Sequence, residues 1–159
     1  MHIERLLLPI IGEQIDQEAA TLATELVRPS HGRIYVLYVI SVPWEYPVDA
    51  ELPQETAKGE RLLDHVEQLL KEKKCDVTAE LLQARNVGTA VVTEAVDREV
   101  DLILMGMSFK RRHGIFYMGD EVPYVLESAP CPVLVMRESM PSEDSPHADI
   151  ETMVSWRGT

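Results

Sequence analysis

The stretch DLILMGMSFKRRHGIFYMGD, residues 101–120, joins an apolar run to a segment that carries glycines and positive charge. The run DLILMGM is typical of a strand that is buried on both faces of a parallel sheet. The glycines of the stretch, Gly106, Gly114 and Gly119, are typical of a loop that lets the backbone approach a ligand. Residues 101–120 therefore predict a buried strand that delivers a loop to a ligand crevice in an α/β protein.

Strands and helices alternate on both sides of this stretch. Near-continuous apolar or β-branched runs predict strands at residues 5–11, 33–40, 76–82, 101–107 and 131–138. Helical spacing of apolar residues predicts helices at residues 14–28, 54–74, 88–99 and 120–128. The pattern indicates an α/β, Rossmann-like fold: a doubly wound five-stranded parallel sheet with helices on both faces, with the weaker third strand at an edge. Ligands of such sheets bind beyond the carboxyl ends of the strands.

The composition restricts the partners and the compartment. The formal net charge is −12, which argues against nucleic acid, because a phosphate backbone selects clustered Lys and Arg. The apolar run near the N-terminus is too short to span a bilayer, so no membrane insertion is expected. Two cysteines, Cys75 and Cys131, do not form a disulfide framework and fit a reducing compartment. We expect a cytoplasmic protein.

The chain divides into one domain and a polar end. Residues 1–138 hold the alternating pattern, whereas residues 139–159 are rich in Pro, Ser and acidic residues. This C-terminal stretch also contains a small apolar patch of Ile150, Met153, Val154 and Trp156. It is either a flexible tail or a short helix that docks on the domain or on a partner.

No catalytic arrangement is recognisable. The five histidines are scattered without the spacing of metal ligands, so no metal site is expected. No Gly-x-Ser-x-Gly elbow is present, and Cys131, between two prolines, is typical of a buried structural thiol. Because no nucleophile and base can be paired, we name no catalytic residue and do not expect an enzyme.

Several segments together resemble the universal stress protein family. The resemblance covers residues 3–137 and depends on LLLPI in the first strand, DLILMG in the fourth, Gly119, and LESAPCPVLVMR at the end of the domain. It implies the fold of the adenine nucleotide alpha-hydrolase-like proteins and a role in stress response or regulation.

The glycine motif departs from the family pattern. Members that bind ATP carry a glycine, two residues, a second glycine, nine residues, and a third glycine followed by Ser or Thr. Gly106 and Gly119 keep that spacing, but Phe109 and Asp120 replace the second glycine and the hydroxyl residue. Ile11 stands where those members carry a nucleoside-binding aspartate. The candidate crevice that the resemblance implies comprises Pro9, Ile10, Ile11, Gly12, Val39, Met105, Gly106, Phe109, Gly119, Asp120 and Glu121.

These departures weaken a phosphate site on physical grounds. Phe109 is expected to place bulk in the path of the pyrophosphate, and the Asp120 carboxylate to cap the following helix in place of an anion. A carboxylate about 4 Å from a phosphate charge costs about 4 kcal/mol at an effective dielectric of 20. A Mg²⁺ ion bridging Asp120 and the phosphates would reverse that sign. No cofactor is expected, and ATP with Mg²⁺ is the alternative.

The sequence leaves two possible roles open for each of two further segments. The basic segment Lys110, Arg111, Arg112 and His113 is either an anion-binding loop or a solvated turn on an acidic surface. Trp44 and Tyr46 follow the second strand and should lie near the crevice. Their rings either stack on a planar ligand or fasten a Pro-rich loop to the sheet.

The last strand predicts an assembly. A final strand in this topology lies at an edge, where unpaired amides and carbonyls favour pairing. The resemblance implies a homodimer through this strand, by Val133, Leu134, Val135 and Met136. The sequence thus predicts a dimeric regulatory module, with an unidentified protein partner, that does not bind ATP by the usual motif. The alternative is an ATP-binding universal stress protein with slow or no hydrolysis.

Overall fold

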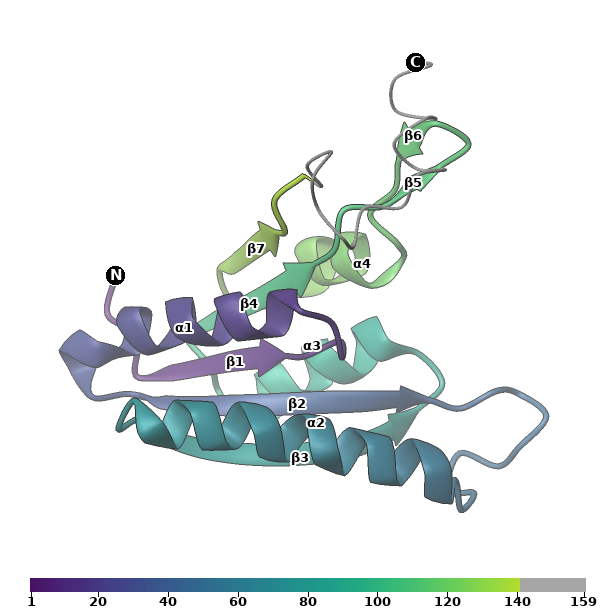
Figure 1. Cartoon of the computed structure of the whole chain (residues 1–159), viewed down its shortest axis with the longest axis horizontal. Helices are drawn as coiled ribbons and strands as arrows, with labels where there is room; N and C mark the ends of the chain where they lie inside the picture. Colours follow the sequence, from purple (N-terminus) through teal and green to yellow (C-terminus); the bar gives the residue numbers. More distant parts are fainter. Residues whose placement is uncertain (141–159) are drawn as a thin grey trace.

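A computed structural model describes residues 1–140 as one α/β domain (Figure 1). The elements of the large sheet alternate along the chain: β1 (Arg5–Pro9), α1 (Ile15–Val27), β2 (Arg33–Ser41), α2 (Pro53–Glu72), β3 (Asp76–Ala84), α3 (Val87–Asp97), β4 (Leu102–Met107), α4 (Glu121–Ser128) and β7 (Val133–Arg137). Two short strands, β5 (Arg111–Arg112) and β6 (Ile115–Phe116), form a separate pair. None of the described helices is long and apolar enough to cross a bilayer.

The order of the strands creates the crevice. The five strands are parallel and lie in the order β3-β2-β1-β4-β7. The chain runs from β1 outward to β3 and then returns to the other side of β1 with β4, so the direction of winding reverses between β1 and β4. The predicted doubly wound parallel sheet is confirmed, with β3 and β7 as its edges. A crevice beyond the carboxyl ends of β1 and β4 follows from this reversal.

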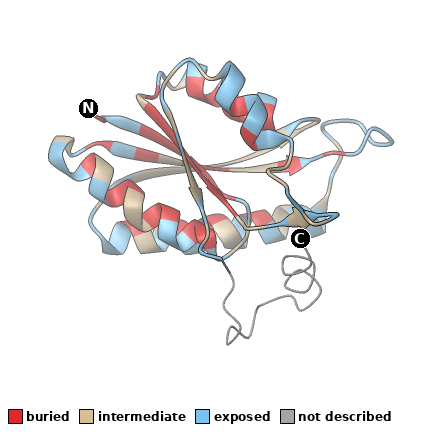
Figure 2. Cartoon of the chain, turned by 90° about the horizontal axis from the view of Figure 1, so that it is seen from above, coloured by how far each residue is buried: buried red, intermediate tan, exposed pale blue. Residues whose placement is uncertain are grey.

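The helices cover both faces of the sheet (Figure 2). On one face, α1 and α2 bury Ala20, Ala23 and Leu70 against Leu6, Leu8 and Leu104. On the other face, α3 and α4 bury Val91 and Val125 against Leu7 and Ile103. Neighbouring residues of β1 thus belong to opposite cores, which is why its sequence is continuously apolar.

The structure corrects the sequence-based boundaries at several places. The first strand ends at Pro9 rather than at residue 11, and the last spans Val133–Arg137 rather than residues 131–138. The segment after β4, predicted as a loop, contains the β5–β6 hairpin, which extends away from the sheet (Figure 1). A 3-10 turn at Arg28–Ser30 was not predicted. The predicted C-terminal tail comprises residues 139–159, of which residues 141–159 lie outside the described residues.

A small charged cluster joins α3 to the edge strand β3. Arg98, directly after α3, lies 2.9 Å from the Glu94 carboxylate and 3.0 Å from that of Glu80 on β3. Its guanidinium also covers the ring of Tyr35, 5.0 Å from the ring centre. Burial, and then a hydrogen bond with Glu80, raises the pKa of Glu94. The same hydrogen bond lowers the pKa of Glu80. One shared proton between the two carboxyl groups therefore favours the folded domain.

We predict that Glu94→Gln stabilises the domain at neutral pH and has little effect in acid. A raised folded-state pKa contributes stability below the ordinary value of 4.5, and this contribution is lost as the pH rises through the folded value. The uncharged amide introduced by the substitution keeps the protonated geometry at every pH. Urea unfolding at about pH 7 should therefore show a gain of about 1 kcal/mol, the size of one net hydrogen bond.

The matched control is Glu127→Gln, at an exposed carboxyl group on α4. Its stability at about pH 7 should lie within about 0.5 kcal/mol of that of the unchanged protein. A Glu94→Gln protein that is less stable than the unchanged protein at neutral pH would contradict the shared-proton account.

Candidate functional site

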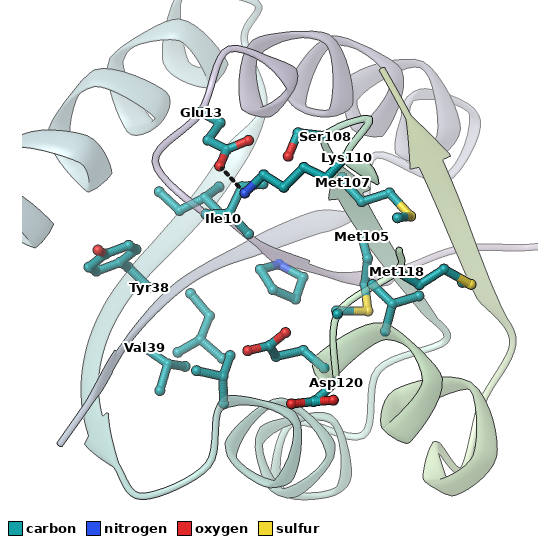
Figure 3. Close-up of a pocket in the computed structure, with 18 of the residues that line it drawn as sticks. Ile10, Glu13, Tyr38, Val39, Met105, Met107, Ser108, Lys110, Met118 and Asp120 are labelled. Atoms are coloured by element: carbon teal, nitrogen blue, oxygen red, sulfur yellow. Dashed lines mark hydrogen bonds and ion pairs between the residues drawn. The ribbon is translucent and has the colours of Figure 1, made fainter. Parts of the chain in front are cut away.

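A cavity of about 410 Å³ lies beyond the carboxyl ends of β1 and β4 (Figure 3). Its walls come from β1, β2 and β4, from the loops that follow β1 and β4, and from the first turns of α3 and α4. Apolar side chains dominate: Ile10, Leu37, Val39, Val87, Met105, Met107, Met118 and Val122. The charged side chains are Glu13, Lys110, Asp120 and Glu121. The cavity is therefore hydrocarbon-lined with an excess of carboxylates.

Most of the predicted crevice residues line this cavity. They are Pro9, Ile10, Ile11, Val39, Met105, Gly106, Gly119, Asp120 and Glu121. Gly12 and Phe109 are not among the lining residues, so the structure corrects their placement. Which ligand these residues bind stays a prediction.

The turn between β1 and α1 is closed by the carboxylate of Asp16. One oxygen lies 3.0 Å from the amide nitrogen of Ile11, and the other lies 2.8 Å from that of Gly12 and 3.3 Å from that of Glu13. Asp16 belongs to the first turn of α1 and is only 5% exposed. Successive amides that converge in this way form an anion-binding concavity. Here the chain fills that concavity with its own side chain.

Two opposing effects act on the Asp16 carboxyl group. Burial raises its pKa above the ordinary value of 3.8, and the three amide hydrogen bonds oppose that rise. The three hydrogen bonds therefore offset the free-energy cost of burying the Asp16 charge. Losing them would leave both the carboxylate and the amides without partners.

Gly106, the first glycine of the motif, is favoured by packing. A Cβ at this position would lie 3.2 Å and 3.3 Å from the Cγ1 and Cγ2 atoms of Ile15. Ile15 is buried at the start of α1, so it can move little. Gly106 therefore allows α1 to lie close over the end of β4, whether or not a ligand binds.

The segment at the third glycine differs from its predicted role. Gly119 has a φ of +75°, a value that glycine adopts without strain. Asp120 holds the N-cap position of α4, but its side chain makes no capping hydrogen bond. The expected cap is therefore wrong, because the backbone of Asp120 is already helical, at φ −99° and ψ −27°, instead of extended. Its carboxylate instead lines the cavity (Figure 3).

Phe109 belongs to the base of the hairpin rather than to the crevice. Its ring stacks on that of Phe116 with the centres 5.8 Å apart, and the Arg137 guanidinium lies 5.3 Å from its centre. Its amide donates to the Glu138 carboxylate over 2.7 Å. The expected obstruction of the pyrophosphate path is therefore wrong. The Phe109 amide is nevertheless occupied by a carboxylate of the chain.

The basic segment forms one strand and the turn of the β5–β6 hairpin. His113 and Gly114 both have positive φ, 53° and 76°, as a two-residue hairpin turn requires. Arg111 donates to the Gly114 carbonyl, and Arg112 lies over the ring of Tyr117. Only Lys110 of this segment reaches the cavity, where its ammonium lies 3.2 Å from the Glu13 carboxylate (Figure 3). The segment does not converge on one anion position.

Trp44 and Tyr46 do not line the cavity. Trp44 is 82% exposed, and its ring lies under the Arg85 guanidinium at 4.7 Å. The loop after β2 is fastened by side chains of β3 and the residue that follows it: Gln83 donates to the Val48 and Ala50 carbonyls, and Arg85 donates to that of Pro43. The expectation that both rings lie near the crevice is therefore wrong, and the loop is held mainly by polar side chains.

The part of the chain that the structure describes brings no metal-binding cluster together. Across residues 1–140, no three His, Cys, Asp or Glu side chains could share one ion. Burial raises the pKa of both cysteines, Cys75 and Cys131, above the ordinary thiol value, so neither is an activated nucleophile.

Sequence reasoning missed two carboxylates that decide the chemistry of the site. Neither Asp16 nor Glu138 was identified from the sequence as part of the site. A signal for Asp16 existed, because it shares a helical face with Ala20, Ala23 and Val27 at spacings of four, seven and eleven. A charge on an apolar face needs an internal partner. Nothing comparable distinguishes Glu138.

Comparisons with known proteins agree with this architecture. The family model described as the Universal stress protein family matches residues 2–137. A universal stress protein of Methanocaldococcus jannaschii is 26% identical over 145 residues, which cover 85% of this chain and 82% of the relative. The sequence-based resemblance is thus confirmed.

Two solved structures share the fold. A universal stress protein of Archaeoglobus fulgidus in complex with dAMP has a TM-score of 0.67 at 13% identity, covering 85% of this chain and 98% of that one. A family member of Arabidopsis thaliana with AMP bound has a TM-score of 0.64 at 15% identity, covering 87% and 96%.

We predict that Asp16→Ala destabilises the domain by about 2–4 kcal/mol, because the amides of Ile11, Gly12 and Glu13 lose their acceptor. Asp16→Asn keeps one acceptor oxygen and should lose less. Urea unfolding of the purified variants measures both changes.

The control for the Asp16 variants is Asp64→Ala, which removes an exposed carboxylate of α2. Its effect should stay within about 0.5 kcal/mol. If Asp16→Ala costs no more than Asp64→Ala, the amide hydrogen bonds do not hold the turn.

Proposed function

Because the chain belongs to the universal stress protein family, we propose that it is a dimeric regulatory or stress-response module that does not bind ATP by the usual glycine motif. The observation that carries the proposal is the charge of the cavity. Among the described residues that line it, three carboxylates, from Glu13, Asp120 and Glu121, face a single ammonium, that of Lys110. A triphosphate would bring further negative charge into this surrounding.

The one ammonium group among the described lining residues, that of Lys110, already has an ion-pair partner. The Lys110 ammonium lies 3.2 Å from the Glu13 carboxylate, so a phosphate would compete with this carboxylate for it. Asp120 and Glu121 open α4, where helix amides would otherwise attract an anion. Two carboxylates at this position oppose that attraction.

Four backbone amides in and beside the crevice also have carboxylate acceptors within the chain. The amides of Ile11, Gly12 and Glu13 bind Asp16, and that of Phe109 binds Glu138. A phosphate would have to displace a carboxylate of the chain to use any of them. Displacement of a charge-assisted hydrogen bond costs more than loss of a neutral one. This arrangement supports a crevice that excludes ATP.

The alternative is an ATP-binding member with slow or no hydrolysis. Three solved structures with the same fold are complexes with dAMP, cAMP and AMP. In this alternative Mg²⁺ would join Asp120 to the phosphates, since carboxylates are good Mg²⁺ ligands. Binding would then require the metal ion, which separates the alternative from the proposal.

The edge strand β7 supports the dimeric part of the proposal. It pairs with β4 on one side only, so within residues 1–140 its other edge has no strand partner. Leu134, its second residue, is 44% exposed. An apolar open edge of this kind favours pairing with a second copy. We infer a homodimer through Val133–Met136, located in the cytoplasm and acting through a protein partner.

Calorimetric titration with ATP, with and without Mg²⁺, tests the ligand part of the proposal. The unchanged protein should give no saturable heat at ligand concentrations up to about 1 mM, which bounds the binding free energy near −4 kcal/mol. Removing both helix-start charges by Asp120→Asn and Glu121→Gln should make ATP affinity measurable, because the repulsion is removed.

The control variant for this titration is Glu127→Gln, on the same helix but outside the cavity lining. It should behave as the unchanged protein does. Micromolar binding of Mg-ATP to the unchanged protein would overturn the proposal and favour the alternative.

Sedimentation velocity tests the dimer. Leu134→Glu places a charge on the open edge and should convert the protein to monomers, since buried unpaired charge opposes association. The control is Val96→Glu, at another exposed apolar position, on α3, which should leave the dimer intact. A monomeric unchanged protein, or a Leu134→Glu protein that remains dimeric, would contradict the assignment.

A further inference from the structure

The cavity has the size and lining of a binding site for a small organic molecule. Its volume of about 410 Å³ lies within the range of pockets that enclose drug-sized ligands. Ile10, Val39 and Met105 line it from the ends of β1, β2 and β4, and Met118 lies on the side of Met105 (Figure 3). Thioether side chains adjust to irregular apolar shapes. Such a lining favours binding of a ligand with a hydrocarbon body over binding of a fully polar ligand.

The charge of the cavity is unevenly distributed. Glu13 and Lys110 pair with each other on the side of α1, whereas Asp120 lies on the side of α4 (Figure 3). Asp120 and Glu121 are both exposed, and no described residue is a hydrogen-bond or ion-pair partner of either carboxylate. A Cβ at Gly119 would lie 3.2 Å from one carboxylate oxygen of Glu121, so this side chain folds back over the glycine. Two adjacent negative charges therefore lie beside the apolar lining.

We propose that the crevice binds an amphipathic organic cation: a hydrocarbon body with one positively charged nitrogen. The body lies on Ile10, Val39 and Met105, and the nitrogen lies beside Asp120 and Glu121. The inference rests on the proposed function, in which the crevice excludes ATP, and it names the ligand class that the same features favour. Charge selects the head group, and the buried apolar area supplies most of the affinity.

Other cations fit these features less well. A divalent metal ion requires more ligands than two neighbouring carboxylates, and residues 1–140 contain no cluster of three acidic, His or Cys side chains around one point. A polyamine lacks an apolar body that could pack against the apolar lining. Carboxylates beside an apolar lining match a ligand that has both a positive charge and a hydrocarbon body.

Calorimetry with three matched probes tests the inference. Decyltrimethylammonium, decyl sulfate and neutral decyl maltoside share one hydrocarbon chain and differ in charge. Each is titrated into the full-length protein below its micelle concentration. The cation should bind saturably, one molecule per chain, at least about tenfold more tightly than the anion, and added salt should reduce the difference.

Charge removal provides the second readout. Asp120→Asn together with Glu121→Gln should weaken the cation by at least about tenfold and leave the neutral probe unchanged. Glu127→Gln should change neither. Circular dichroism and urea unfolding show that the variants are folded before they are titrated.

Each outcome decides the inference. Equal binding of the three probes, no binding of the cation, or cation binding that is insensitive to charge removal would overturn it. A parallel Mg-ATP titration separates the two proposals. If ATP binds, the proposed function fails; if neither ATP nor the cation binds, the proposed function stands and only this inference falls.

Discussion

The Asp16 carboxylate, held by the amides of Ile11, Gly12 and Glu13, is the contact on which the crevice depends. It fixes the path from β1 into α1, and α1 in turn places Ile15 against Gly106 at the end of β4. The same contact consumes the backbone donors that face the point where the sheet reverses direction. One buried charge thus shapes the crevice and reduces its capacity for a second anion.

The spacing of Gly106 and Gly119 has a structural explanation in this chain. Gly106 is favoured by the close approach of α1, and Gly119 by a positive φ. Both demands persist without a phosphate ligand, so the glycines can remain while the polar positions around them change. The substituted positions, by contrast, carry the electrostatic difference: Asp120 adds negative charge where an anion would bind, and Ile11 adds apolar surface.

The fold was predictable because its signals are local and periodic. Continuous apolar strands and amphipathic helices indicated the element order. The weaker and more alternating apolar pattern of residues 76–82 indicated an edge strand, and β3 does lie at an edge. The site was less predictable. Phe109 was placed in the crevice from motif spacing, but the β5–β6 hairpin carries it onto Phe116. Two-residue strands give no periodic signal, so this hairpin could not be foreseen.

The direction in which side chains point was the other feature that the sequence did not reveal. Sequence spacing located Asp120 at the start of α4, but could not show that its backbone is helical and its carboxylate free of a capping role. Glu138 is brought to the Phe109 amide only by the parallel pairing of β4 and β7. Such contacts depend on tertiary geometry and have no counterpart in local sequence.

The amide resonances of Ile11, Gly12 and Glu13 report most directly whether the chain's own carboxylate excludes an anion from this turn. We predict that their nitrogen and proton shifts remain unchanged when inorganic triphosphate is added to the labelled protein at neutral pH. Saturable shifts of these three resonances would show that the ligand displaces Asp16, and would contradict the account.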